Sequence, residues 1–346
     1  MKFASTWIYL IFFIALSIVS TIWVLNKTSI DLSLFRQIDF KIIGLSFILG
    51  LAVYVVDSFR YYLYARALGD SLSLRICLRA VIANFFFSWI TPAAILGMPA
   101  TVFVLTKSGV KLDRAIVITT GKSLLGVALF LLLTFSLMTL GYGPKQMEGG
   151  LANLILWGGG IYVAILIFPL MWAIHPAPLY KLLAHWDEEL KKFESGFFYY
   201  LKKFLKALKD TISTLEALLY QGGRWIIPII LSHIIYYLFF MATGLVLAMG
   251  LQGISLSDIF GPMTVFTAAS LVAPTPGGAG VAEAIINACF VPPMTPDNAL
   301  IIALGYRTMT FYLQTLIGLI WFILIIIRKR STVEEMHRYL KTRRGV

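Results

Sequence analysis

The chain has few of the residue types on which most enzymes depend for their chemistry. Among its 346 residues are two cysteines, Cys77 and Cys289, which lie far apart in apolar surroundings, and four histidines without metal-ligand spacing. This pattern supports neither a disulfide framework nor a metal site. The sequence also lacks a Ser/His/Asp set, a clustered acid pair and a phosphate-binding loop. We therefore expect no cofactor, exclude an ATP-driven pump, and predict a non-enzyme in preference to an enzyme.

Charged residues are scarce as well. They make up 13% of the chain, against about 25% in typical soluble domains, while hydrophobic residues make up 59%. Apolar runs of about 20 residues, long enough to cross a bilayer, recur along the sequence. Alternation with a period of two is missing, which excludes a transmembrane barrel. The sequence therefore predicts an all-α, polytopic integral membrane protein whose residues 1–346 form a single membrane domain.

Six apolar segments are long enough for full spans, near residues 4–25, 40–64, 114–140, 153–174, 225–249 and 298–327. The first follows Lys2, but its length of about 20 residues and its lack of a cleavage site favour a retained span over a signal peptide. Regions 76–106 and 258–291 are instead broken by prolines and glycines. Their arms of about 15 residues give about 22 Å of helix against a hydrocarbon core of about 30 Å. We expect two re-entrant hairpins, with full spans across all eight hydrophobic segments as the alternative.

The basic residues, which give the chain a net charge of +12, gather at the ends of apolar segments, in loop 175–224 and in tail 328–346. Because basic loops favour the cytoplasmic side, we predict that the loop, the tail and both chain termini are cytoplasmic. The number of crossings between these points then requires region 76–106 to enter from the cytoplasmic face and region 258–291 from the outer face. Opposed broken elements of this kind are typical of transporters with inverted repeats.

Loop 175–224 has an apolar stripe that recurs every three or four residues from Trp186 to Leu208, with lysines on the opposite side. It predicts a basic amphipathic helix with two equally favoured placements. The helix lies on the anionic cytoplasmic leaflet, or it belongs to a helical hairpin packed onto the protein's own cytoplasmic end. We expect anionic membrane lipids, and no nucleic acid, as partners. The oligomeric state is left open, with a homodimer among the candidates.

Three ionisable residues, Lys122, Glu283 and Arg307, lie within apolar segments, where burial of a charge is costly and usually marks function. Lys122 lies about 12 Å from the cytoplasmic end of its span, so it has either a functional role or a snorkelling, anchoring role. Arg307 is deeper, and Glu283 is its expected partner. Their pair either fastens the second hairpin to the last span or lines a polar cavity that meets a charged headgroup.

The tip of the second hairpin, "APTPGG", combines two helix-stopping prolines with Gly277 and Gly278, which permit a tight reversal. The helix that begins near Gly280 would present backbone N–H groups suited to a lipid phosphate. Asn287 lies four residues after Glu283 and therefore on the same helical face. These features make the tip a candidate substrate-binding element.

Polar residues elsewhere have simpler interpretations. Asp57 and Arg60, three residues apart beside an aromatic run, are expected to form an ion pair at the membrane interface. Asn84, Ser88 and Thr91 lie near the tip of the first hairpin. They either bind a headgroup or satisfy the broken backbone, and the second interpretation is preferred.

The motifs "PTPGGAGVAEA" and "GYRTMTF" resemble the lysylphosphatidylglycerol synthase transmembrane-region family, and "TPAAILGMPATVFVLTKSGVKLDRAI" resembles its first broken segment. That family includes the flippase half of the bacterial multiple peptide resistance factor. The resemblance implies a protein of bacterial or archaeal cell membranes that moves lipid between leaflets, with Glu283 and Arg307 at matching polar positions. It also implies a stand-alone member without the aminoacyl-transferase domain. One departure is Met98, where the family often has the glutamate of a Gly-Glu-Pro step.

We therefore expect a flippase-like protein that translocates a phospholipid, aminoacyl-lipid or glycolipid headgroup between leaflets. The alternatives are an integral-membrane transferase and an accessory scaffold in lipid or lipid-linked glycan biosynthesis. The candidate substrate-binding residues are Glu283, Arg307, Gly277, Gly278, Asn287, Lys122 and Asn84.

Overall fold

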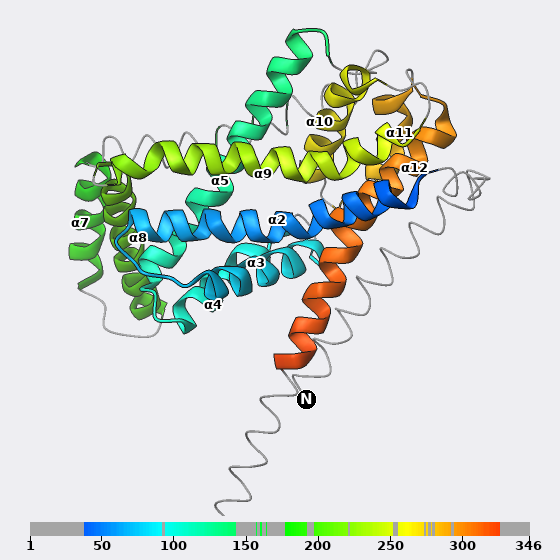
Figure 1. Ribbon diagram of the computed structural model, residues 1–346. Coiled ribbons are helices and arrows are strands. Elements are labelled where there is room, and N and C mark those ends of the chain that lie inside the picture. Colours follow the sequence, from blue (N-terminus) through cyan, green and yellow to red (C-terminus); the bar gives the residue numbers. More distant parts are fainter. Residues whose placement is uncertain are drawn as a thin grey trace, which may run out of the picture.

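The computed structural model describes residues 38–91, 94–142, 177–191, 197–220, 222–251, 255–272, 281–291 and 294–325, with isolated residues between them (Figure 1). The regular secondary structure in these residues is helical, which confirms the all-α class. The predicted span 4–25, nearly all of the predicted span 153–174, both chain termini and the basic tail lie outside the described residues.

Four of the described helices are long and apolar enough to cross a membrane. They are α2 (Phe40–Ala67), α5 (Leu112–Thr139), α9 (Gly223–Met249) and a continuous helix over Pro296–Ile325. The last begins as α12 (Pro296–Arg307) and passes through a π-helical segment, η4 (Thr308–Tyr312). These four match predicted spans 40–64, 114–140, 225–249 and 298–327 to within a few residues. The protein is therefore a polytopic membrane protein, as the hydropathy pattern predicts.

Helices α2 and α9 run side by side through the middle of the molecule (Figure 1). The Ser46 hydroxyl, early in α2, donates a hydrogen bond to the Thr243 carbonyl oxygen, late in α9, at 2.6 Å. Gly250, which caps the C-terminal end of α9, approaches Ile38, just before α2. The two helices are therefore antiparallel, and their C-terminal ends lie at opposite ends of the molecule.

The first hairpin consists of α3 (Leu74–Trp89) and α4 (Gly97–Lys107), which give about 24 Å and about 16 Å of helix, both shorter than a hydrocarbon core of about 30 Å. It starts at the C-terminal end of α2 and folds back along α2. At its tip, the Thr91 hydroxyl donates to the Phe87 carbonyl and accepts from the Leu96 amide. This confirms that Thr91 satisfies the broken backbone.

The second hairpin consists of α10 (Leu256–Val272) and α11 (Val281–Phe290). It starts at the C-terminal end of α9 and folds back along α9, where Thr264 contacts Met241. Gly278, between the two helices, is buried and has a φ of 68°, a left-handed conformation that favours glycine. Because α2 and α9 are antiparallel, the two hairpins enter from opposite ends. This confirms the predicted opposed arrangement.

The two halves of the described chain have the same order of helices: one long, two short, one long. The first half contains α2, α3, α4 and α5. The second contains α9, α10, α11 and the long helix Pro296–Ile325 that begins as α12, and α7 and α8 lie between the halves in the sequence. In the first half α5 is antiparallel to α2, because Arg114 near the start of α5 binds Asp70 beyond the end of α2. In the second half, the last helix runs parallel to α2, because Met309 approaches Gly50 and the Gln314 carbonyl accepts from the Tyr54 hydroxyl one turn further along both helices. It is therefore antiparallel to α9. The topology is that of an inverted repeat.

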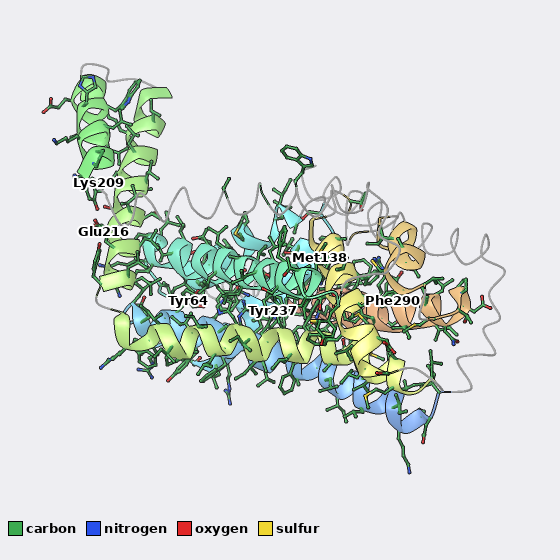
Figure 2. All side chains as sticks on the ribbon, turned by 90° about the horizontal axis from the view of Figure 1, so that it is seen from above. Tyr64, Met138, Lys209, Glu216, Tyr237 and Phe290 are labelled. Atoms are coloured by element: carbon green, nitrogen blue, oxygen red, sulfur yellow. The ribbon has the colours of Figure 1, made fainter. Side chains whose placement is uncertain are left out.

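Helices α7 (Ala177–Lys191) and α8 (Phe197–Tyr220) lie side by side at the end where α2 ends and α5 begins (Figures 1 and 2). The Thr214 hydroxyl donates to Asp113 of α5 at 2.7 Å, and the Tyr180 hydroxyl of α7 donates to Glu216 of α8 at 2.9 Å. Burial, with this hydrogen bond, raises the pKa of Tyr180 to about 12. Of the two placements predicted for loop 175–224, the structure has the packed helical hairpin. Its cytoplasmic location stays a prediction.

Candidate functional site

Three charged side chains meet between α2 and α5, in the interior of the protein. Lys122 Nζ lies 2.9 Å and 2.8 Å from the two carboxylate oxygens of Asp57. Arg60 Nη1 lies 2.8 Å from Asp57 Oδ1. The Asp57 side chain is fully buried, and those of Arg60 and Lys122 are only 4% and 5% exposed. We call these three residues the charged triad; it holds two cations against one carboxylate.

The triad corrects two expectations about depth. Asp57 and Arg60 form the ion pair predicted from their spacing, but both are buried among protein helices, whereas an interfacial pair is expected to be exposed at a helix end. Asp57 precedes the last residue of α2 by ten residues, or about 15 Å of helix. The snorkelling interpretation of Lys122 is also wrong, because its amine binds Asp57 in the interior. A neighbouring carboxylate on α2 offers the ammonium group a closer partner than the interface.

Aromatic rings from two helices cover the cations of the triad. Lys122 Nζ lies 4.1 Å from the ring centre of Tyr61 on α2, and Arg60 Cζ lies 4.1 Å from that of Tyr236 on α9. Tyr237 contributes a second ring near Arg60, and Figure 2 shows it among the long helices. Both distances lie within the range of cation–π attraction, which gains strength away from water. The cations are therefore stabilised by faces of tyrosine rings as well as by the single carboxylate.

His233 of α9 connects the second half to the triad. Its two ring nitrogens lie 2.8 Å from the Ile229 carbonyl oxygen and 3.1 Å from the Lys122 carbonyl oxygen. A neutral imidazole has one N–H, so it donates to only one of these oxygens at a time. On sequence alone the histidines carry no pattern. The signal that marks His233 is its isolated position within an otherwise apolar span.

A glycine on α5 leaves room for this packing. A Cβ atom at Gly126 would lie 2.7 Å from Arg60 Nη2 and 3.2 Å from the His233 ring. Glycine at this position therefore lets α2, α5 and α9 approach one another around the guanidinium group.

The triad also connects to the first hairpin, where Asn84 is a predicted binding residue. The Tyr61 hydroxyl lies 3.5 Å from the Thr101 hydroxyl on α4, and the Asn84 amide donates to the same Thr101 oxygen at 3.2 Å. Lys122 and Asn84, both predicted from the sequence, thus belong to one chain of polar contacts through Tyr61 and Thr101. Whether Asn84 binds substrate stays a prediction.

The remaining predicted residues lie in the second half. Arg307 is 4% exposed near the end of α12, with Cζ 5.2 Å from the ring centre of Phe311. Glu283 and Asn287 lie on α11, but their side chains are outside the described residues, as is Gly277. The Glu283–Arg307 pair therefore stays a prediction. The neighbouring Tyr306 hydroxyl lies 3.1 Å from that of Thr267, which joins α12 to the second hairpin.

One comparison with known proteins gives a match. Within the described residues, no group of histidine, cysteine, aspartate and glutamate side chains is arranged to hold a metal ion. A comparison with curated proteins gives no match. The sequence matches the family described as "Lysylphosphatidylglycerol synthase TM region" over residues 7–318, which include both hairpins and the charged triad. The match points to a lipid-related function in a membrane, and the chain therefore belongs to the lysylphosphatidylglycerol synthase transmembrane-region family.

Proposed function

We propose that this protein translocates lipid headgroups between the two leaflets of a bacterial or archaeal cell membrane. The observation that carries the proposal is the charged triad, which places two cations and one carboxylate inside membrane-spanning helices. The lipid is a phospholipid, an aminoacyl-lipid or a glycolipid whose headgroup passes through the protein while its acyl chains stay in the bilayer.

The charge imbalance of the triad favours an anionic headgroup. A buried ion is costly even when it is paired, and a cluster with one excess positive charge is costlier than a neutral pair. Within the described residues, the buried Nε–H of Arg60 has no hydrogen-bond partner. A phosphodiester would balance the excess charge and accept from this donor. Lys122 and Arg60 can therefore exchange part of their interaction with Asp57 for contacts with a passing anion.

The inverted halves supply the architecture that such exchange needs. In transporters with inverted repeats, broken elements meet near the middle of the membrane, and irregular backbone there lines a cavity. The two hairpins start at opposite ends of the molecule, and both contact the frame formed by the long helices α2, α5 and α9. We propose that Glu283 and Arg307 form a second polar site that contacts the headgroup during translocation, at the end of the protein opposite the first hairpin.

Transport can be tested with fluorescent lipids in liposomes that contain the purified protein. A quencher added outside reports the rate at which labelled phosphatidylglycerol reaches the outer leaflet. We expect wild-type protein to accelerate this exchange over empty liposomes, and Lys122→Met to reduce it by about tenfold, the equivalent of one lost favourable contact with the anion. Glu283→Gln and Arg307→Ala are expected to slow exchange as well. The matched control is Lys107→Met, since Lys107 is an exposed cation at the end of α4.

Two results would contradict the proposal. Liposomes with folded wild-type protein that exchange lipid no faster than empty liposomes would exclude translocation. Wild-type rates in folded Lys122→Met, Glu283→Gln and Arg307→Ala would show that the site is misassigned. Chromatography of the recovered lipid tests the transferase alternative, because a transferase would change the lipid chemically.

A further inference from the structure

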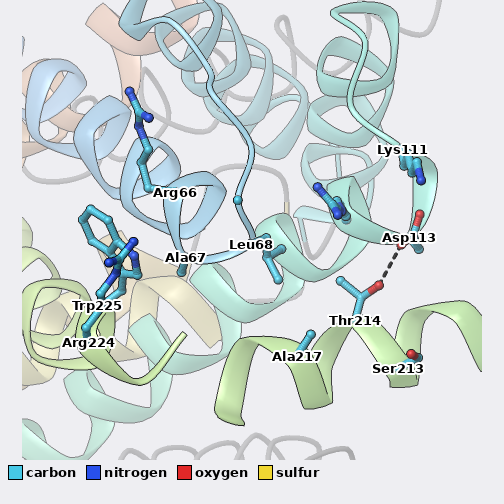
Figure 3. Close-up of a pocket in the computed structure, with 12 residues that line it drawn as sticks. Arg66, Ala67, Leu68, Lys111, Asp113, Ser213, Thr214, Ala217, Arg224 and Trp225 are labelled. Atoms are coloured by element: carbon cyan, nitrogen blue, oxygen red, sulfur yellow. Dashed lines mark hydrogen bonds between the residues drawn. The ribbon is translucent and has the colours of Figure 1, made fainter. Parts of the chain in front are cut away.

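A cavity of about 530 Å³ lies where the C-terminal end of α2, the N-terminal ends of α5 and α9, and helix α8 come together (Figure 3). It is distinct from the charged triad and contains none of the binding residues predicted from the sequence. Four cations line it: Arg66, Lys111, Arg114 and Arg224. We call it the basic pocket.

The basic pocket has an excess of positive charge. Arg114 Nη1 is 2.7 Å from Asp70, and Asp113 accepts a hydrogen bond from Thr214 at 2.7 Å. Within the described residues, the other three cations, Arg66, Lys111 and Arg224, form no ion pair. Arg66, Lys111 and Arg224 are exposed, so an incoming ligand can reach them. The pocket is therefore built to attract an anion.

The backbone adds to this preference. Helix α5 begins after Lys111 and helix α9 after Gly222, and neither N-cap residue makes a side-chain capping bond. The first N–H groups of a helix and its positive dipole end favour phosphate and other anions. Arg66, in the last turn of α2, offsets the negative end of that helix. Cations from three helices and their ends, two helix N-termini and one cavity thus converge on one place.

The basic pocket lies in line with the charged triad. Along α2, Arg66 follows Arg60 by six residues, or about 9 Å, and along α5, Arg114 precedes Lys122 by eight residues, or about 12 Å. Tyr64 lies between the two sites, where its hydroxyl donates to the Gly121 carbonyl at 3.1 Å and its ring meets His233 edge-on. A group bound in the pocket is therefore one buried tyrosine away from the triad.

We infer that the basic pocket binds a phosphate group and is the first docking point of the substrate on the side of the membrane where α7 and α8 lie. A lipid phosphodiester and a free phosphate share the chemistry that these cations recognise. The lipid source rests on the proposed function, which this inference deepens because it names an anionic phosphate headgroup as the substrate class. The α8 wall of the pocket, with Ser213 and Thr214, gives the α7–α8 hairpin a role in shaping the site.

Binding can be measured without transport, on the full-length protein in an uncharged detergent. The ligands are inorganic phosphate, short-chain phosphatidylglycerol and short-chain phosphatidylcholine with the same acyl chains, titrated by calorimetry at two salt concentrations. The test variant is Arg66→Gln/Arg224→Gln, which removes two exposed cations, and the control is Lys107→Gln outside the pocket. At about a fivefold change in Kd per cation, we expect the double variant to raise the Kd for phosphatidylglycerol roughly thirtyfold. We also expect high salt to weaken wild-type binding.

The possible results distinguish a lipid headgroup from free phosphate as the ligand. They also distinguish failure of the pocket inference from failure of the proposed translocation. Tight binding of phosphatidylglycerol with weak binding of inorganic phosphate supports a lipid headgroup, while equal binding of both supports a soluble phosphate ligand in the same pocket. An unchanged Kd in the folded double variant, or equal affinity for phosphatidylcholine, would overturn the inference. Intact binding without lipid exchange contradicts only the proposed translocation. Exchange that is unaffected by loss of the two arginines contradicts only the role of the pocket in transport.

Discussion

The two halves of the membrane domain share their helix order but differ in where they carry charge. In the first half the carboxylate, Asp57, is on the long helix α2, and its partner Lys122 is the eleventh residue of α5. In the second half α9 has no carboxylate, and the buried cation, Arg307, is the twelfth residue of α12. The cations thus occupy similar positions in α5 and α12, the last helix of each half, whereas the carboxylates do not occupy similar positions.

The two halves therefore differ in the element that carries the carboxylate: a long helix in the first half and the hairpin in the second. Asp57 is held in the frame formed by α2, α5 and α9, while Glu283 lies on α11, the ten-residue second helix of a hairpin. The halves are also not independent, because α9 contributes Tyr236 and His233 to the triad of the first half. The comparison teaches that inverted halves can share a topology while, within the described residues, the ion pairs of the long helices lie in the first half.

The substitution with the largest expected effect is Asp57→Asn, which tests whether the frame depends on this carboxylate. It leaves Arg60 and Lys122 buried without an opposite charge, and loss of one member of a buried ionic group costs about 3–5 kcal/mol. The free energy of unfolding, measured by titration with SDS in mixed micelles, is expected to fall by that amount. Glu283→Gln, on the hairpin, is expected to lower it less.

A double variant controls for the volume and polarity of the new side chain. Asp57→Asn/Lys122→Met has the same net charge in the cluster as the wild type, so it should recover part of the stability lost by Asp57→Asn. An Asp57→Asn protein as stable as wild type, or a double variant less stable than both single variants, would show that the triad does not hold the frame together.

The second comparison concerns how tightly each hairpin packs. A Cβ atom at Gly261, in α10, would meet the backbone carbonyl of Tyr142, while one at Gly97, in α4, would meet mainly the Ser88 hydroxyl, with the Asn84 carbonyl oxygen 3.0 Å away. A side chain can turn away but a backbone carbonyl cannot, so Gly261→Ala should cost more than Gly97→Ala. We expect losses of about 1–3 kcal/mol, the range for overpacking, in the same unfolding assay.

Relief by a second substitution distinguishes the two contacts. Ser88→Ala removes the hydroxyl that obstructs a side chain at position 97, so it should restore part of the stability of Gly97→Ala and none of that of Gly261→Ala. Equal rescue of both variants by Ser88→Ala would contradict the packing described for the two hairpins.

Spans, breaks and opposed hairpins could be predicted from the sequence because hydropathy, proline and glycine act locally. Gly278 and Thr91 have the turn and capping roles that their residue types suggest. The triad could not be predicted, because Lys122 and Asp57 are 65 residues apart in the chain. Their meeting depends on how α2 and α5 rotate about their axes. A span that faces lipid on one side and protein on the other is apolar all round, so its sequence does not mark its inner face.

The basic pocket was missed for a different reason. Its four cations come from the end of α2, the N-cap and first turn of α5 and the start of α9, and each is an ordinary flanking residue of a membrane span. The positive-inside pattern explains each of them singly, so the sequence carries no sign that they converge. The packing of α8 against α5, through Thr214 and Asp113, supplies the wall that turns the space between them into a pocket.

The smallest effect that we expect, a coupling of about 1 kcal/mol, comes from a contact that joins the halves. Trp89 Nε1, at the end of α3, donates to Gln314 Oε1, in the last helix, at 2.8 Å. Gln314 is fully buried, and within the described residues its Nε2 has no hydrogen-bond partner. Trp89→Phe leaves both ends of this amide unpaired, and we expect a loss of about 1–3 kcal/mol. Gln314→Leu removes the unpaired amide together with the acceptor, so its cost should be smaller.

The double variant decides between a hydrogen bond and simple packing as the link between the halves. Because Trp89→Phe/Gln314→Leu leaves neither a donor nor an acceptor, its loss should be smaller than the sum of the two single losses. The three unfolding free energies and that of wild type give the coupling directly, and we expect about 1 kcal/mol. Strictly additive losses would mean that the two side chains contribute through shape alone. The first hairpin would then be held to the second half by apolar contacts such as Phe86 with Gly318.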